Sequence, residues 1–416
     1  MSALAALLAR QERSHPNAID LGLARVREVA GRLGLLEPAH RVITVGGTNG
    51  KGSTVAYLDG LLRGAGLRCG RFTSPHLSRY NERICIDGVE ASDDALIAAF
   101  GRIDAARGDI TLTFFEYNAL AALELFARAP VDVAVLEVGL GGRLDATNII
   151  DADVAVVCSI GIDHVDWLGP TREQIAREKA GIFRSGRPAV LGSADMPHSM
   201  FEAIDSIGAI PIVPGRDYRI TRSGETWRFD MGDTHLEPLP LPALAGHLQM
   251  SNAASALAAL AAGRFHGALA HANAVRALCE VRIRGRFQVV PGEVEWIFDV
   301  AHNVPAAEGL RLNLEALPRK RTIAVCGVLG DKDIAGITRT LAPVIDGWVL
   351  AGLAGPRSVD ARDLAGRLPA GAQVLARADD VRSACRLARE SCRPGDRIVV
   401  FGSFLTVGPA LEFLGI

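Results

Sequence analysis

The chain contains 416 residues, of which 49% are hydrophobic and 22% are charged, and its formal net charge is −2. A chain of this length exceeds what one hydrophobic core usually supports, so we expect a soluble protein of two domains. The charge balance argues against nucleic-acid binding, and the longest apolar run, near residues 253–262, is too short to span a bilayer. Seven cysteines without C-x-x-C spacing, and an N-terminus without a basic leader, favour a cytoplasmic location.

A helical pattern over residues 20–35 precedes the motif that organises the chain. Residues 42–45 form a β-branched run typical of a buried strand, and the glycines that follow allow a turn that brings backbone N–H groups to an anion. Lys51 supplies a charge for phosphate oxygens, and Ser53 or Thr54 supplies a hydroxyl for Mg²⁺. A valine replaces the first glycine of G-x-x-x-x-G-K-[ST], and an extra glycine precedes the serine. We nevertheless predict a nucleotide-phosphate site rather than an ordinary glycine-rich turn.

A second predicted strand, over residues 67–73, leads into a proline-containing loop that carries Arg79 and Arg83. Ligands of open α/β sheets bind at the carboxyl ends of the strands, and this loop leaves such an end. Each arginine considered alone fits ordinary solvated surface nearly as well.

Glu137 lies near the end of a third predicted strand, over residues 131–138. A carboxylate in an apolar strand is costly to bury unless it meets a cation. A metal opposite the phosphate loop is one explanation, and a structural salt bridge is the other. A fourth predicted strand, over residues 154–160, is followed by Asp163 and His164, and this position favours His164 as a metal ligand over a hydrogen-bonded structural residue.

Thr171 opens a capping-box pattern that predicts a helix through Lys179. A lysine late in a helix suits the helix dipole, and this one could also face the metals. Another helix is predicted over residues 114–128. Strands that alternate with helices indicate a parallel, doubly wound sheet.

Residues 205–245 contain prolines and short alternating runs, which predict a small antiparallel excursion from the first domain. A helix follows over residues 249–262, and Asn252 near its start is either a cap or an adenine-binding side chain. A basic, glycine-containing hinge at residues 282–288 marks the domain boundary.

Strand patterns beyond the hinge predict a second α/β domain, at residues 295–300, 322–325, 348–350 and 397–401. The predicted fold class is therefore α/β: a P-loop-containing, doubly wound parallel-sheet ATPase domain with a second, smaller Rossmann-like α/β domain. The predicted limits are residues 1–285 and 286–416.

Several individually rare motifs occur in order along nearly the whole chain. They are Gly-Thr-Asn-Gly-Lys-Gly-Ser (47–53), Ser-Pro-His-Leu (74–77), Leu-Glu-Val-Gly-Leu-Gly-Gly-Arg-Leu-Asp-Ala-Thr-Asn (136–148), Asp-His-Val-Asp-Trp-Leu-Gly (163–169), Glu-Lys-Ala-Gly-Ile-Phe (178–183), Asp-Val-Ala-His-Asn (299–303), Gly-Asp-Lys-Asp (330–333) and Gly-Ser-Phe-Leu-Thr-Val (402–407). Together they resemble folylpolyglutamate synthases of the Mur ligase superfamily, and more closely the bacterial bifunctional dihydrofolate synthase/folylpolyglutamate synthases.

The resemblance implies ATP and two Mg²⁺ sites. The implied nucleotide-binding residues are Thr48, Asn49, Gly50, Lys51, Gly52, Ser53, Asn252, Arg286, Asp299 and His302, and the implied metal ligands are Ser53, Ser74, Glu137 and His164. The expected substrate-binding residues are Phe115, Arg143, Asp145, Ala146, Asp331 and Ser403, and the expected catalytic residues are Lys51, Arg83, Lys179 and His302. Lys179 matches a lysine that is carbamylated in this family. Arg284 stands where the family usually has proline, which leaves Arg286 in place but the stiffness of the hinge open.

The resemblance implies ligation of L-glutamate to dihydropteroate and to reduced folates by a monomer, without nucleic-acid or membrane partners. A carboxylate is a poor electrophile, so ATP must first convert it to an acyl phosphate, which the amine of glutamate then attacks. Folylpolyglutamate synthase activity alone is one alternative. A muramyl-peptide ligase is another, although such enzymes carry a domain ahead of the phosphate loop, for which the residues before Gly46 leave no room. A nucleotide-dependent switch is a third, but it would not explain the polar groups at the strand ends.

Overall fold

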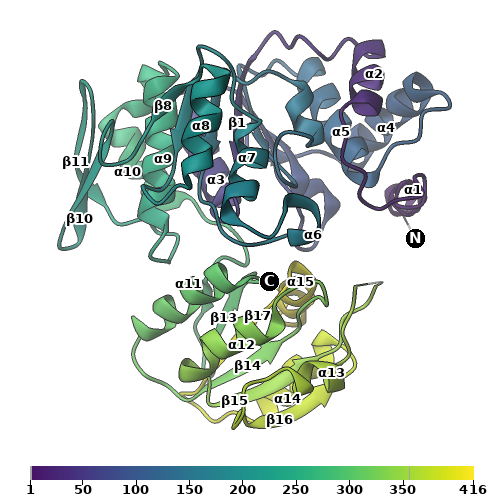
Figure 1. The fold of residues 1–416 in the computed structure, drawn as a ribbon. Helices are drawn as coiled ribbons and strands as arrows, with labels where there is room; N and C mark the ends of the chain where they lie inside the picture. The colour runs from purple at the N-terminus through teal and green to yellow at the C-terminus, as the bar shows by residue number, and fades with distance from the viewer. Residues whose placement is uncertain (1, 356) are drawn as a thin grey trace. The chain divides into compact units, whose positions relative to one another are not determined.

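The computed structural model of the protein describes residues 2–355 and 357–416 (Figure 1). Contacts within this part of the chain divide it into two compact units. The first unit contains the chain up to Ile160, Trp167–Leu241 and Met250–Val281, and the second contains Gly161–Asp166, Pro242–Gln249 and the chain from Arg282 onward. Two short segments therefore belong to the second unit although both of their chain neighbours belong to the first. The domain limits at residues 285 and 286 stay a prediction.

A mainly parallel sheet forms the centre of the first unit. Among the described residues it has eight strands in the order β4-β3-β2-β5-β1-β6-β7-β8. The strands are β1 (Arg41–Gly46), β2 (Cys69–Phe72), β3 (Ile84–Ile86), β4 (Val89–Glu90), β5 (Val133–Glu137), β6 (Val154–Val157), β7 (Pro188–Leu191) and β8 (Ile210–Ile212). Strands β2, β3 and β4 pair antiparallel at one edge, and the other pairs are parallel.

The four strands expected from the sequence form the middle of this sheet, in the order β2-β5-β1-β6. They are buried on both faces, which is why each reads as a nearly continuous apolar run. The outer strands β3, β4, β7 and β8 were not expected. They are only two to four residues long, so their sequences carry little periodic signal.

Helices cover the faces of this sheet (Figure 1). The helices of this part of the chain are α1 (Ala3–Gln11), α2 (Ala24–Arg32), α3 (Lys51–Gly64), α4 (Asp93–Arg107), α5 (Phe114–Arg128), α6 (Val165–Leu168), whose first two residues belong to the second unit, α7 (Arg172–Ala180), α8 (His198–Ile207), α9 (Gln249–Ala262) and α10 (His271–Glu280), with 3₁₀ turns η1 (Tyr80–Arg83), η2 (Ala146–Ile149) and η3 (His266–Leu269). The expected capping box of α7 is present, since the hydroxyl of Thr171 accepts from the Gln174 N–H and the Gln174 side chain accepts from the Thr171 N–H.

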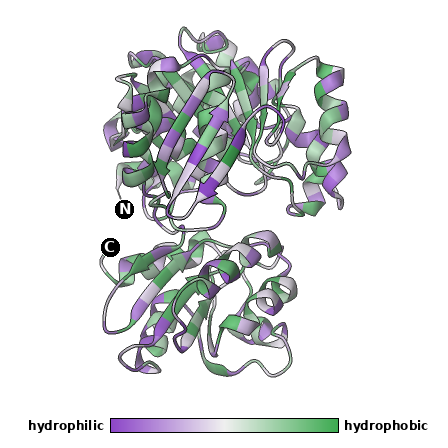
Figure 2. Ribbon diagram, turned by 90° about the vertical axis from the view of Figure 1, so that its left-hand side faces the viewer, coloured by the Kyte–Doolittle hydropathy of each residue, from purple (hydrophilic) through white to green (hydrophobic). Residues whose placement is uncertain are grey.

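The excursion expected at residues 205–245 contains a small antiparallel sheet in the order β11-β10-β9. Its strands are β9 (Arg219–Ser223), β10 (Thr226–Met231) and β11 (Thr234–Pro240). Figure 2 shows hydrophilic and hydrophobic residues interleaved along these strands. This alternation is typical of an antiparallel sheet with one face in solvent.

A second parallel sheet forms the centre of the second unit, in the order β12-β13-β17-β14-β15-β16. Its strands are β12 (Gln288–Val290), β13 (Glu295–Asp299), β14 (Thr322–Cys326), β15 (Gly347–Ala351), β16 (Val374–Ala378) and β17 (Arg397–Phe401), of which β12 alone among these pairs antiparallel. The helices are α11 (Val304–Glu315), α12 (Ile334–Leu341), α13 (Ala361–Gly366), α14 (Val381–Glu390) and α15 (Phe404–Phe413), with the 3₁₀ turn η4 (Ala342–Val344). Ile297, Trp348 and Phe401 lie in its buried core.

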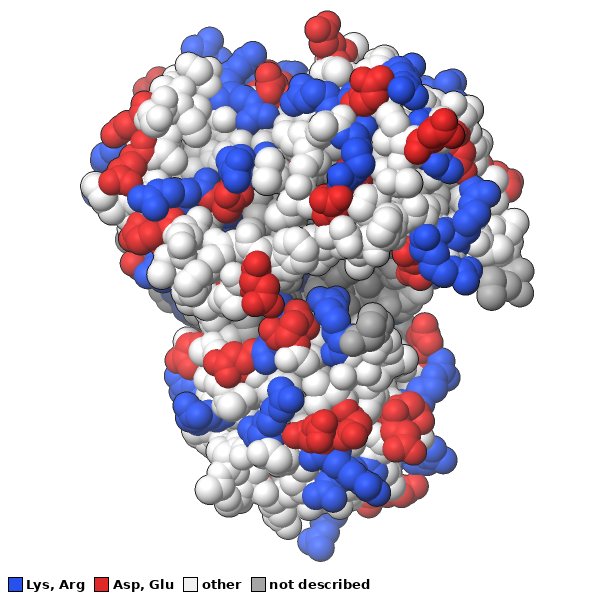
Figure 3. All heavy atoms as spheres, turned by 45° about the vertical axis from the view of Figure 1, so that its right-hand side comes forward, with Lys and Arg blue, Asp and Glu red and all other residues white. Residues whose placement is uncertain are grey.

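Acidic and basic side chains are interspersed over the face of the molecule drawn in Figure 3. This mixture agrees with the small net charge of the sequence. Within residues 2–355 and 357–416, every helix lacks either the length or the apolar character that crossing a bilayer requires.

Candidate active site

The glycine-rich loop between β1 and α3 adopts a conformation that requires glycine. Gly47 has φ of 142° and Gly50 has φ of 91°, both in the region that side chains rarely occupy. A Cβ atom on Gly50 would lie 2.6 Å from Oδ1 of Asn252, which is buried in α9. The loop and α9 therefore meet at a point where only a hydrogen atom fits, and the predicted adenine-binding residue lies beside the predicted phosphate loop. Asn252 lies inside the first turn of α9, so it is not the N-cap.

Hydrogen bonds to the end of β6 hold the loop in place. The Thr48 N–H donates to the Ser159 carbonyl at 2.8 Å, and the Asn49 N–H donates to the Ser159 hydroxyl at 3.1 Å. The ammonium of Lys51 donates to the carbonyls of Gly47 and Thr48, at 3.1 and 3.3 Å. Lys51 is the first residue of α3, so its charge and the free N–H groups of a helix N-terminus occur together.

Glu137 is the last residue of β5, and its residue surface is 3% exposed. Its Oε2 accepts a hydrogen bond from the Ser74 N–H at 3.1 Å, so two of the predicted metal ligands lie side by side. Carboxylate and hydroxyl oxygens are hard donors of the kind that Mg²⁺ prefers. The chemistry of these two residues therefore fits the predicted metal.

Arg83 is buried at the end of the loop that begins with Ser74. Its Nε donates to Nδ1 of His76 at 2.8 Å, and its guanidinium lies over the rings of Tyr80 and Phe114, at 5.7 and 5.6 Å from their centroids. Burial, together with the Arg83 charge, lowers the pKa of His76 to about 4, so at neutral pH its imidazole is uncharged and accepts this hydrogen bond. Burial also lowers the pKa of Arg83, which nearby acidic groups including Glu137 oppose.

The turn after β5 is organised by Asp145. Its Oδ2 accepts from the N–H groups of Gly139 and Leu140, at 3.0 and 2.9 Å, and its Oδ1 accepts from both the N–H and the hydroxyl of Thr147. A Cβ atom on Gly139 would lie 2.5 Å from the ring of Phe115, so the ring packs directly on this turn. Burial raises the pKa of Asp145 although these hydrogen bonds oppose it. Three predicted substrate-binding residues, Phe115, Asp145 and Ala146, therefore belong to one local structure.

The end of α7, which carries Lys179, contacts the same turn, which carries Arg143. Lys179 is buried in the last turn of α7, and its Nζ lies 3.5 Å from the Gly141 carbonyl. Arg143 has a largely exposed side chain that pairs with Glu178 at 2.8 Å. The amine of Lys179 is thus held in a buried environment, whereas the guanidinium of Arg143 forms an ion pair at the surface.

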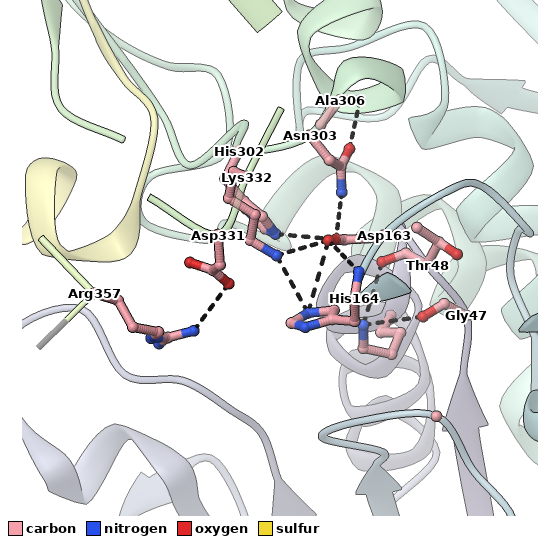
Figure 4. A network of polar contacts seen from close by, with 12 residues as sticks. Gly47, Thr48, Asp163, His164, His302, Asn303, Ala306, Asp331, Lys332 and Arg357 are labelled. Carbon is pink, nitrogen blue, oxygen red and sulfur yellow. Dashed lines mark hydrogen bonds and ion pairs between the residues drawn. The ribbon is translucent and has the colours of Figure 1, made fainter. Parts of the chain in front are cut away.

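In the second unit, side chains converge on the carboxylate of Asp163 (Figure 4). Lys332 Nζ lies 2.6 Å from Oδ1, and Asn303 Nδ2 donates to Oδ2 at 2.9 Å. His302 Nε2 lies 3.7 Å from Oδ2, and its Nδ1 is 2.8 Å from the Val300 carbonyl. Burial disfavours the charged carboxylate, but the hydrogen bond from His302 and the charges of His164 and Lys332 outweigh it, so the pKa of Asp163 lies well below its ordinary value.

Four further predicted residues of this unit have structural partners. Asp299 ends β13 and accepts from the N–H groups of Phe287 and Ala301, at 2.9 and 2.8 Å; burial raises its pKa while the charge of Arg286 opposes the shift. The Arg286 guanidinium lies 5.7 Å from the ring centroid of Phe404. Ser403 is the N-cap of α15 and accepts from the Leu405 N–H. Asp331 pairs with Arg357 at 3.2 Å.

Sequence reasoning did not assign site roles to Asp163, Lys332 and Asn303. Lys332 lies in the Gly-Asp-Lys-Asp motif and Asn303 ends the Asp-Val-Ala-His-Asn motif, so both belong to motifs that carry the family resemblance. Their partnership depends on a contact between residues 169 positions apart, which no local pattern reveals.

The predicted metal ligands are divided between the units. Ser53, Ser74 and Glu137 belong to the first unit, and His164 belongs to the second. Considering only the residues that the structure describes, three or more His, Cys, Asp or Glu side chains do not gather into a group that could hold a metal ion.

Comparison with known proteins connects these motifs to a family. Residues 45–206 match the Mur ligase middle domain, and residues 285–404 match the Mur ligase glutamate ligase domain. The chain is 47% identical to the dihydrofolate synthase/folylpolyglutamate synthase of Escherichia coli, over 99% of this chain and 96% of that protein. This chain belongs to the dihydrofolate synthase/folylpolyglutamate synthase family. It is therefore an ATP-dependent ligase of the Mur ligase type, as the sequence motifs predicted.

Solved structures of dihydrofolate synthase/folylpolyglutamate synthases have the same fold. E. coli FolC in complex with DHPP and ADP superposes with a TM-score of 0.94 at 46% identity, and covers 99% of this chain and 98% of its own. A bifunctional folylpolyglutamate synthase/dihydrofolate synthase with Mn, AMPPNP and L-glutamate bound has a TM-score of 0.91 at 43% identity, over 100% of this chain and 99% of its own. These structures confirm the predicted fold class, and they show nucleotide and a divalent metal bound in relatives.

Proposed function

We propose that this chain joins L-glutamate to dihydropteroate, forming dihydrofolate, and to reduced folates, extending their glutamate tails. ATP would phosphorylate the acceptor carboxylate, and the amine of glutamate would displace phosphate from the acyl phosphate to form an amide, with ADP as the other product. The similarity to the E. coli enzyme along 99% of the chain carries the proposal.

The phosphate loop would bind the triphosphate. Its backbone N–H groups, the N-terminus of α3 and the ammonium of Lys51 supply positive potential at one place. Positioning and charge neutralisation account for most of the catalysis of phosphoryl transfer, so these groups match the step. Arg286, Asp299, His302 and Asn252 are proposed to bind the remainder of the nucleotide.

Ser53, Ser74, Glu137 and His164 would hold divalent cations. The adjacency of Ser74 and Glu137 supports this assignment. When bound, Mg²⁺ neutralises charge on the phosphate oxygens. Arg83 lies on the same loop as Ser74, and His76 holds its guanidinium, so we propose that Arg83 adds a fixed positive charge beside Glu137.

Lys179 is proposed to carry a carbamate, formed when its neutral amine adds to CO₂ and releases a proton. Its burial supports the idea, because desolvation disfavours an ammonium and a carbamate can pair with metal ions. The modification would replace a cation by an anion facing the metals.

Phe115, Asp145 and Ala146 are proposed to line the site of the pterin ring. The packing of Phe115 on the turn that Asp145 organises supports a shared role. Arg143, Asp331 and Ser403 are proposed to contact substrate carboxylates or the incoming glutamate. Their present ion-pair and capping partners would have to be shared or exchanged when substrate binds.

ADP release from the pure protein with ATP, Mg²⁺ and glutamate tests the proposal, with dihydropteroate or tetrahydrofolate in separate reactions. We expect release with both acceptors, little without an acceptor, and none with the Lys51→Ala variant. Release with tetrahydrofolate alone would reduce the function to folylpolyglutamate synthesis. No ADP release with either acceptor would contradict the folate assignment and favour a muramyl-peptide acceptor. ADP release that is equally fast without any acceptor would favour a nucleotide switch.

We also propose a cytoplasmic location. All seven cysteines are free thiols in the structure, which suits a reducing compartment. Fractionation of cells that express the chain, followed by immunodetection, would contradict this location if the protein were found outside the cytoplasmic fraction.

A further inference from the structure

The segment Gly161–Asp166 is a part of the second unit inserted between parts of the first. Ile160 before it and Trp167 after it both belong to the first unit. The segment carries His164, the only predicted metal ligand among the described residues of the second unit. Side-chain contacts, and not the covalent chain on either side, must therefore attach this segment to the second unit.

The attachment is the carboxylate of Asp163. Lys332, from the loop before α12, lies 2.6 Å from Oδ1, and the side chains of both residues are only 8% exposed. Asn303, which caps α11, donates to Oδ2 at 2.9 Å. Figure 4 shows these groups, with His302, directed at the one carboxylate. A buried ion pair that loses one partner leaves an uncompensated charge, so this junction resists opening.

Asp163 also fixes the backbone of His164. The His164 N–H donates to Oδ1 of Asp163 at 2.9 Å. His164 has φ of 51°, a left-handed conformation that is uncommon for residues with a side chain and that this hydrogen bond helps to hold. The carboxylate of Asp163 thus contributes both to the attachment of the segment and to the backbone conformation from which the His164 side chain projects.

We propose that Asp163 is a positioning residue, which fastens the His164 segment to the second unit through Lys332 and Asn303 and so presents His164 to its metal. The metal in this statement rests on the proposed function, but the fastening does not. The opposite role for Lys332 is competition with the metal, because its Nζ is also 3.4 Å from Nε2 of His164. The two roles predict opposite effects of removing the ammonium.

Hydrogen–deuterium exchange of the nucleotide-free chain tests the fastening directly. We expect the backbone amides of residues 161–166 to exchange about tenfold faster in Lys332→Met than in the wild type, while amides of β6 keep their rates. Lys332→Arg should restore slow exchange because it restores the ion pair. Lys320→Met is the matched control, since the ion pair of Lys320 is with Glu295, at 3.2 Å within the same unit.

A second variant separates fastening from loss of a lysine. Asn303→Asp keeps the side-chain oxygen that accepts from the Ala306 N–H at the start of α11, but it replaces the donor to Asp163 by a like charge. It should also speed exchange in residues 161–166. Wild-type exchange in both Lys332→Met and Asn303→Asp would overturn the proposal.

Mn²⁺ binding, titrated by electron paramagnetic resonance with AMPPNP present, provides the metal readout. Partners that orient a metal ligand typically change affinity by about 10- to 100-fold, so we expect the Mn²⁺ dissociation constant to rise about tenfold in Lys332→Met and to recover in Lys332→Arg. Unchanged or tighter Mn²⁺ binding in Lys332→Met would overturn the presenting role and favour competition. A wild-type chain that binds no Mn²⁺ would contradict the proposed function, and the exchange rates would still decide the fastening.

Discussion

Gly50 combines two constraints that are usually separate. Its φ of 91° disfavours any side chain, and the space for a Cβ atom is closed by Asn252 at 2.6 Å and by Cys158 at 3.2 Å. A substitution here must therefore displace the side chain of Asn252 or shift the phosphate loop, as well as strain one residue.

We expect Gly50→Ala to weaken AMPPNP binding by at least about tenfold, because the loop N–H groups would leave their positions. Gly66→Ala is the control: Gly66 has φ of 79° but nothing within 4 Å of its Cβ position, so it shares the backbone strain without the contact. Isothermal titration of both variants checks this, and equal affinity losses in the two would contradict it.

We expect Lys179→Ala to lose most ligase activity, because the proposed carbamate would be missing, and to regain part of it when a short carboxylate such as acetate is added. The rescue should be measured as ADP release with and without the carboxylate. Full activity of the variant would leave Lys179 a helix-end cation, with no part in binding the metals.

At the scale of elements, buried carboxylates join neighbouring helices. Glu124 of α5 accepts from Arg102 of α4 and from Arg128 one turn later in its own helix. Burial raises the pKa of Glu124, but the hydrogen bonds from the two arginines outweigh it, and the net pKa is lowered from 4.5. A lowered pKa means that ionised Glu124 stabilises the fold above the unfolded value and that this contribution is lost as the pH falls through the folded value.

We expect Glu124→Gln to lower the free energy of unfolding of the first unit by about 1 kcal/mol at pH 7. The difference from the wild type should shrink as the pH falls from 4.5 toward the lower folded pKa, at which the carboxyl of the folded wild type also loses its charge. Urea unfolding at several pH values measures this. The control is Glu28→Gln. Because Glu28 and its partner Arg32 are both exposed, this substitution should hardly change the free energy of unfolding at any pH. A loss in Glu124→Gln that does not depend on pH would contradict the argument.

At the scale of the whole molecule, each unit has its own mainly parallel sheet, with two buried clusters in the first unit and one in the second among the described residues. Neither unit contains all of the residues assigned to nucleotide and metal: the phosphate loop, Ser74 and Glu137 belong to one, and His164, Arg286 and His302 belong to the other. The residues assigned to the proposed activity are therefore distributed over both units.

We expect the protein to be a monomer, because one chain supplies every residue to which we assign a role. Sedimentation equilibrium should give the mass of one chain at micromolar concentration, with and without AMPPNP and Mn²⁺. A mass that rises with concentration to that of a dimer would contradict this expectation.

The sequence by itself determined the features that are encoded locally. The phosphate loop, the polar residues at the ends of β5 and β6, the capping box of α7 and the four central strands are each specified within a few consecutive residues. Backbone conformation, helix capping and hydrophobic periodicity act over that range, so their patterns are visible in the chain.

Only the tertiary structure decided which distant residues meet. The outer strands β3, β4, β7 and β8 are too short to show a period, and they exist because the central sheet offers them partners. Asn252 lies against Gly50, and Lys332 against Asp163, through contacts that no local pattern contains. The segment of His164 belongs to the second unit for the same reason. The buried carboxylate of Asp163 is stabilised by the cation and the amide that the fold brings close to it. The energy of this interaction depends on distance and burial, and not on how far apart the residues are in the sequence.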